Sequence, residues 1–128
     1  MGRSEEIVAR ARACVGARFR PHGRDPAFGL DCVGVAAVAF RRDVPTGYPL
    51  RGGHAGGIAG IIDRMGLIRV AGASQAGDLL LLRVGHAQFH LAVRTGEGFV
   101  HADAGLRRVV ETPGEPVGDM VACWREAH

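Results

Sequence analysis

The sequence predicts an α+β fold in which N-terminal helices pack on a C-terminal antiparallel β-sheet. Two observations support this. Apolar residues recur at helical spacing in the first half of the chain, and from residue 67 onward short β-like runs alternate with turns. Helices that precede strands, instead of alternating with them, are typical of α+β folds. The 128 residues contain no internal repeat and no linker-like stretch, so we expect a single domain over 1–128.

Three helices are predicted in the first half. Ser4 is a suitable N-cap for the first helix, which we expect to run from about residue 5 to 15. Asp31 is a suitable N-cap for the second, and its sequence "CVGVAAVAF" is apolar on all sides, so this helix should be central and buried. Residues 51–60 are rich in glycine and resemble a loop, and Ile58, Ile61, Ile62 and Met65 suit a short third helix that Gly66 ends. That loop lacks the Gly-Lys-Ser/Thr ending of a phosphate-binding loop.

Six short β-like runs follow these helices. They span 67–70, 78–84, 89–94, 99–102, 107–111 and 119–125.

Two histidines lie within these runs, and a hairpin over 89–102 would bring them together. If Arg94 faces Phe99 across the turn, His90 and His101 become diagonal neighbours on one face, with backbones roughly 7–8 Å apart. That separation allows one imidazole to hydrogen-bond the other. A slip of one residue would place them on opposite faces. The alternative interpretation is that His90 and His101 are two polar residues on the solvent-exposed face of the hairpin.

Cys32 is predicted to stand at the first turn of the second helix. Unpaired backbone N–H groups and the positive end of the helix dipole favour the thiolate, so we expect the pKa of Cys32 to be lowered. The Asp31 carboxylate opposes this, less so if it turns toward the N–H groups two and three residues on. The alternative is a structural cysteine in a buried helix, and that is our prediction for Cys14 and Cys123.

Composition and charge exclude several classes of protein. The net charge is +3 and every basic residue is arginine. The sequence contains no basic run with interleaved aromatic residues, so nucleic-acid binding is not predicted. Three widely spaced cysteines form no disulfide framework, which indicates a reducing compartment where the chain folds. Charges interrupt the N-terminal stretch, so we expect no signal peptide, and no apolar run is long enough to span a membrane. Synthesis in the cytoplasm is therefore expected.

Cys32, His90 and His101 also leave a metal site open as an interpretation, because all three are zinc-ligand types. The sequence lacks the close ligand spacings of structural zinc sites, and it contains no Cys-x-x-Cys or His-Glu-x-x-His motif.

With these residues in place, the sequence resembles the NlpC-type family of papain-like cysteine peptidases. It is most similar to the stand-alone cell-wall peptidases of phages and gene-transfer particles. The matching elements are "VGARFRPHGRDPAFGLDCVGVAAVAF" (15–40), "AGDLLLLRV" (76–84), "HLAV" (90–93) and "GFVHADAGLRRVVE" (98–111).

The resemblance implies a cysteine endopeptidase that cleaves peptidoglycan stem peptides, typically between D-γ-glutamate and a diamino acid. Cys32 would be the nucleophile, His90 the base and His101 its orienting partner, with an acyl-enzyme intermediate and no metal or organic cofactor. Phage-tail or particle proteins are compatible partners, and delivery inside such a particle, or release by lysis, would bring the chain to the cell wall. Neither a nucleic-acid partner nor a membrane span is expected.

One departure from the family pattern concerns the substrate contacts. Many relatives carry a tyrosine where this chain has Phe19, so a hydroxyl near the active site is missing. We expect Phe19, His22, Asp31 and Tyr48 to contact substrate, with packing as the alternative role for Tyr48. Two other functions stay open: a papain-like amidase or acyltransferase on another substrate, and a non-catalytic phage-tail or cell-wall-binding component.

Overall fold

The structure is a computed structural model that describes residues 2–46, 48, 55–85 and 88–127, with His54 and His86 outside these ranges. Its helices are α1 (Arg3–Ala13), α2 (Cys32–Phe40) and α3 (Ala55–Asp63). Its strands are β1 (Arg24–Asp25), β2 (Gly29–Leu30), β3 (Ile68–Arg69), β4 (Leu79–Gly85), β5 (Gln88–Arg94), β6 (Gly98–Asp103), β7 (Arg108–Pro113) and β8 (Asp119–Arg125).

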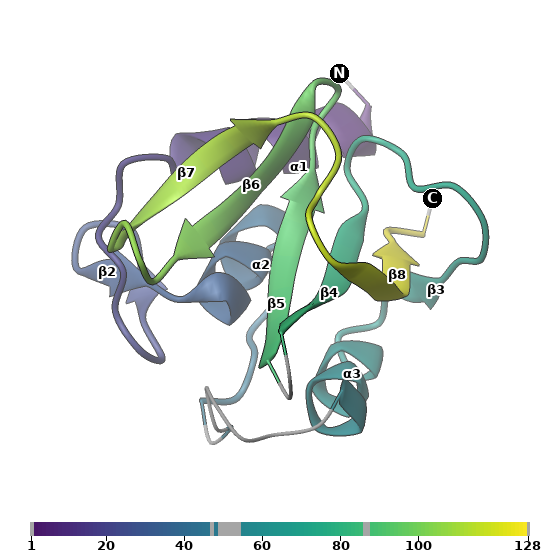
Figure 1. The fold of residues 1–128 in the computed structure, drawn as a ribbon, viewed down its shortest axis with the longest axis horizontal. Coiled ribbons are helices and arrows are strands. Elements are labelled where there is room, and N and C mark those ends of the chain that lie inside the picture. The colour runs from purple at the N-terminus through teal and green to yellow at the C-terminus, as the bar shows by residue number, and fades with distance from the viewer. Residues whose placement is uncertain (1, 47, 49–54, 86–87, 128) are drawn as a thin grey trace.

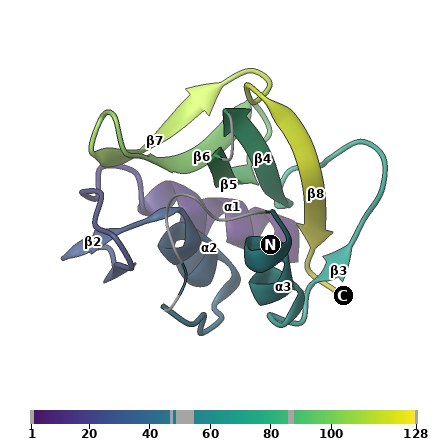
Figure 2. The ribbon, with the colours of Figure 1, turned by 60° about the horizontal axis from the view of Figure 1, so that its bottom comes forward.

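An antiparallel sheet of six strands, in the order β3-β8-β4-β5-β6-β7, forms one layer of the molecule (Figure 1). The helices α1 and α2 lie together on one side of it, beneath β5, β6 and β7 (Figure 2). The short strands β1 and β2 pair with each other just before α2. The predicted α+β class, with helices packed on a C-terminal antiparallel sheet, is therefore confirmed.

Helix α2 is the centre of this arrangement, as its composition predicted. Seven of its nine residues are buried, so the helix is enclosed by the sheet and by its neighbours. Asp31 caps it, since its carboxylate accepts a hydrogen bond from the Gly34 N–H at 2.7 Å. Arg41, in the left-handed conformation, ends it.

Two details of the other helices differ from the prediction. Helix α1 begins at Arg3, with Gly2 as its N-cap instead of Ser4, and the Glu6 N–H donates to the Gly2 carbonyl at 3.0 Å. Helix α3 begins at Ala55, three residues before Ile58, the first residue assigned to the predicted third helix, so residues 55–57 are helix instead of glycine-rich loop. Burial of apolar residues on one side of α3, such as Ile62, outweighs the roughly 1 kcal/mol that each glycine costs in a helix.

Strand β4 is buried on both faces of the sheet, which explains its continuous apolar run. Leu79 and Leu81 point into the main core with the helices, whereas Leu80 and Leu82 join a smaller cluster with Ala92. Residues on a strand point alternately to its two faces. None of the described helices is both long and apolar enough to cross a lipid bilayer.

The pairing of β5 with β6 is short, and this matters for the site. Its register joins Val93 to Val100 and Arg94 to Phe99, so the predicted alignment at Arg94 is confirmed. Beyond these two pairs the ladder stops, although β5 stays paired with β4 and β6 with β7. The backbone of β5 near Leu91 is thereby open to the N-terminus of α2.

Gly34 is needed where α2 meets the preceding segment, because a Cβ atom there would lie 2.1 Å from the Gly23 carbonyl oxygen. A methyl group at that distance must displace backbone. We expect Gly34→Ala to lower the free energy of unfolding by about 1–3 kcal/mol, measured by urea denaturation. Gly57→Ala in α3 is the matched control: nothing lies within 4 Å of its added Cβ. That variant should gain about 0.5–1 kcal/mol, and equal effects at both positions would contradict this account.

Candidate active site

Cys32, His90 and His101 line one pocket of about 580 Å³, although they come from α2, β5 and β6. Cys32 is the first residue of α2, and the two histidines lie where β5 and β6 are no longer paired. The other lining residues are Phe19, Pro21, Asp31, Val84, Gln88, Phe89, Ala102, Asp103, Ala104 and Gly105.

The two histidines hydrogen-bond each other. His90 Nε2 lies 2.8 Å from His101 Nδ1, and the rings stand edge to face with centroids 5.0 Å apart. This is the diagonal contact that the hairpin register predicted. It leaves His90 Nδ1 as the ring nitrogen that is not engaged by His101.

A further member of this chain of contacts escaped the sequence analysis. The His101 Nε2 atom lies 2.9 Å from the hydroxyl oxygen of Thr112 on β7. The signal for it was the second hairpin: Phe99 pairs with Thr112, which makes Thr112 a diagonal neighbour of His101.

Burial raises the pKa of the Cys32 thiol from 9.0 to about 11. The N–H groups of Leu91, Val33 and Cys32 itself lower it, while the Asp31 charge raises it. The predicted lowering of this pKa is therefore wrong. A helix N-terminus contributes only about 0.3–1 kcal/mol, and removing the thiolate from water costs more.

His90 is neutral at physiological pH for a similar reason. Burial lowers its pKa from 6.5 to about 4, with a further lowering by the charge of His101 and an opposing effect of Asp103. Burial also lowers the pKa of His101. Among the described side chains, no hydrogen bond joins the Cys32 thiol to His90. Cys32 and His90 are thus a thiol and a neutral imidazole that line the same pocket.

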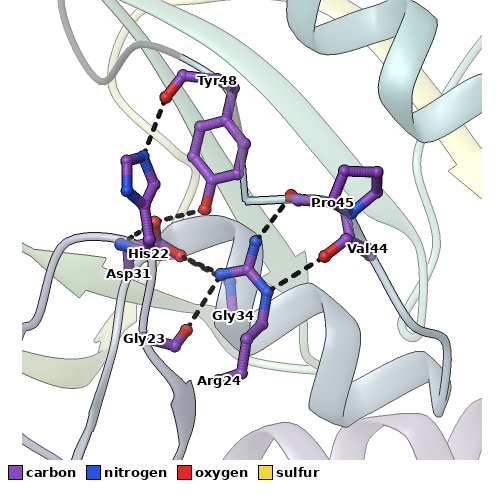
Figure 3. A network of polar contacts seen from close by, with 8 residues as sticks. All are labelled: His22, Gly23, Arg24, Asp31, Gly34, Val44, Pro45 and Tyr48. Carbon is purple, nitrogen blue, oxygen red and sulfur yellow. Dashed lines mark hydrogen bonds and ion pairs between the residues drawn. The ribbon is translucent and has the colours of Figure 1, made fainter.

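The carboxylate of Asp31, which has no exposed surface, fixes the first turn of α2, the helix that carries Cys32 (Figure 3). One of its oxygens accepts hydrogen bonds from Gly34 N–H and from the Arg24 guanidinium at 3.1 Å. The other accepts from the His22 N–H at 2.8 Å and from the Tyr48 hydroxyl. Four donors therefore occupy the four lone-pair positions of this group.

The predicted substrate contacts divide into two groups. Phe19 lines the pocket, and its role there stays a prediction. Tyr48 is buried and lies outside the lining, and its pKa is raised by burial and by the bond to Asp31. His22 also lies outside the lining, because its ring packs edge-on against Tyr48 at 4.7 Å and bonds the Tyr48 carbonyl. Asp31 takes part in this network and also lines the pocket. Contacts of Asp31, Tyr48 and His22 with substrate therefore stay a prediction.

The other two cysteines and the possible metal site can also be compared with the prediction. Cys14 and Cys123 are buried, as predicted. Within the described ranges, no three His, Cys, Asp or Glu side chains are grouped in a way that would hold a metal ion, and Cys32, His90 and His101 do not form such a group.

Comparison with solved structures identifies the fold. The NlpC/p60 domain of the peptidoglycan hydrolase SagA is 27% identical over 86% of this chain and 88% of its own, with a TM-score of 0.55. This chain has the fold of the NlpC/p60 domains. The p60 domain of the M. avium subspecies paratuberculosis antigen MAP1204 covers 97% of this chain and 93% of its own, at 18% identity and a TM-score of 0.65.

A third similar structure is longer than this chain. The peptidoglycan hydrolase RipB of Mycobacterium tuberculosis is 21% identical, with a TM-score of 0.64, and the match spans 96% of this chain but 64% of RipB. No protein-family model matches the sequence. The curated proteins contain no significant match to it either.

The raised pKa of Cys32 has a measurable consequence. Thiolate is the nucleophile in alkylation, so below pH 11 each added pH unit should raise the rate at Cys32 about tenfold. Cys32 should still react before Cys14 and Cys123, because Cys32 lines the pocket whereas the other two are buried and lie outside its lining. Iodoacetamide labelling from pH 7 to 10, read for each cysteine by mass spectrometry, measures this. A rate at Cys32 that reaches a plateau below pH 8.5 would show a stabilised thiolate and contradict it.

Proposed function

We propose that this chain is a cysteine peptidase of the NlpC/p60 type that hydrolyses an amide bond in peptidoglycan stem peptides. The observation that carries the proposal is the His90–His101 hydrogen bond in the pocket that also holds Cys32. The similarity to the peptidoglycan hydrolase domain of SagA supports the substrate class. For the scissile bond we propose the one between D-γ-glutamate and a diamino acid, which the sequence resemblance implies.

In the proposed reaction, Cys32 Sγ attacks the scissile carbonyl carbon while His90 Nδ1 takes the thiol proton. The two transfers are coupled, because the resting thiol has a pKa of about 11 and His90 is neutral. The carbonyl oxygen gains negative charge as the S–C bond forms. Backbone N–H groups at the start of α2, including that of Cys32, are suited to stabilise it.

The tetrahedral species then collapses. The C–N bond breaks, and the proton on His90 goes to the leaving amine, which leaves a thioester between Cys32 and the acyl group. Water hydrolyses this thioester with His90 again acting as base. His101 holds the His90 ring and stabilises the imidazolium that forms twice in the cycle. The charge of Asp103, which raises the pKa of both histidines, contributes in the same direction.

Cys32→Ala should abolish cleavage without unfolding the protein. The test is digestion of muropeptides that contain the D-γ-glutamyl–diaminopimelate bond, with the two product fragments identified by mass spectrometry. Cys14→Ala is the matched control and should retain activity, since Cys14 is buried away from the pocket residues. Full activity of Cys32→Ala would contradict the proposal.

The same assay separates the alternatives. A wild-type protein that sediments with peptidoglycan but cleaves nothing would favour a cell-wall-binding component. Cleavage of other amides or thioesters alone, lost in Cys32→Ala, would favour a papain-like amidase or acyltransferase. Delivery by a phage-like particle stays a prediction from the sequence resemblance.

A further inference from the structure

Thr112 completes a chain of contacts that runs from β5 through β6 to β7. His90 Nε2 lies 2.8 Å from His101 Nδ1, and His101 Nε2 lies 2.9 Å from Thr112 Oγ1. The backbone that carries the Thr112 hydroxyl is well fixed, because β7 pairs with β6 over six consecutive residue pairs. A β-branched side chain on such a strand also has few rotamers.

The face of the His101 ring is held independently of its edge. Phe99, the cross-strand partner of Thr112, packs on that ring at a centroid distance of 4.8 Å and an angle of 34°. Phe99 therefore restricts how the ring tilts. Among the residues that the structure describes, Thr112 is the hydrogen-bond partner of the His101 nitrogen that faces away from His90.

A neutral imidazole has one N–H donor and one acceptor nitrogen, so the chain of contacts has only two possible polarities. In the first, His90 Nε2–H donates to His101 Nδ1, and His101 Nε2–H donates to Thr112. This leaves the lone pair of His90 Nδ1 free. In the second, every donor is reversed, His90 Nδ1 carries the proton, and His90 cannot act as a base.

A threonine hydroxyl can donate as well as accept, so the contact with His101 Nε2 is compatible with both polarities. We propose that Thr112 is a positioning residue for the reaction: its hydroxyl oxygen acts as the acceptor for His101 Nε2–H, and this hydrogen bond stabilises the first polarity. The proposal rests on the proposed function for its catalytic meaning, but the tautomers themselves are a property of the free protein. Thr112 acts through two imidazoles and touches no substrate atom. Its hydroxyl would do for His101 what His101 does for His90.

The first test reads the tautomers in the wild-type protein. Protonated and unprotonated imidazole nitrogens have well separated ¹⁵N chemical shifts, so two-dimensional NMR of histidine-labelled protein at pH 7 assigns each ring. We expect both His90 and His101 to carry hydrogen on Nε2. Hydrogen on Nδ1 of His101 would overturn the proposal.

The second test removes the acceptor. Thr112→Val keeps the shape and the strand preference but cannot accept a hydrogen bond, so we expect His101 to lose its single tautomer and kcat for muropeptide cleavage to fall about tenfold, with KM unchanged. Thr112→Ser restores the hydroxyl and should recover both the spectrum and kcat to within about twofold. Thr46→Val, at an exposed position, is the control for the substitution itself.

Thr112→Val with wild-type tautomers and wild-type kcat would overturn the role of Thr112. If the wild type cleaves no muropeptide, the proposed function fails, and the ¹⁵N spectra of the wild type and Thr112→Val still decide whether Thr112 sets the tautomer.

Discussion

The buried carboxylate of Asp31 is the constraint on which the rest of the structure depends. It ties the segment before α2, the first turn of α2 and Tyr48 to a single point (Figure 3). A buried charge is tolerated only when it is paired and fully hydrogen-bonded, and here Arg24 and three further donors meet that condition. Because Cys32 is the next residue, the position of its sulfur follows from this network.

The same arrangement decides the chemistry of the thiol. Enclosing α2 gives Cys32 a rigid mount beside β5, but it also removes the sulfur from water, and Asp31 adds a negative charge nearby. Both effects oppose the thiolate. The helix N-terminus and the N–H of Leu91 favour it, and they are the weaker influence in the resting site. In the proposed reaction, Cys32 is therefore activated during the attack, through His90, and no thiolate is stored beforehand.

Much of this could be predicted from the sequence where short-range rules apply. The Asp31 cap follows from its position before an apolar run, and the histidine pair follows from counting residues across one hairpin. Both rest on residues close together in the chain. The start of α3 was wrong because local glycine content outweighed, in the prediction, burial that only the folded chain provides.

The parts that escaped prediction depend on contacts between distant segments. Thr112 meets His101 only because a second hairpin has a definite register. Tyr48 lies 17 positions after Asp31, beyond α2, and no sequence pattern indicates that its hydroxyl returns to Asp31. The pKa of Cys32 depends on how deeply α2 is enclosed, which composition alone does not measure. For this reason, an argument from the helix N-terminus alone predicted the wrong direction for the pKa shift of Cys32.

The most direct measurement of the central claim is the free energy of unfolding of Asp31→Ala, set against Asp25→Ala. Asp25 is exposed and accepts one hydrogen bond from the Ala27 N–H at 2.9 Å, so its loss should cost less than about 1 kcal/mol. Loss of Asp31 leaves Arg24 and three donors without their acceptor, and should cost more than about 3 kcal/mol. A cost below about 1 kcal/mol for Asp31→Ala would contradict the claim that this carboxylate holds the nucleophile segment in place.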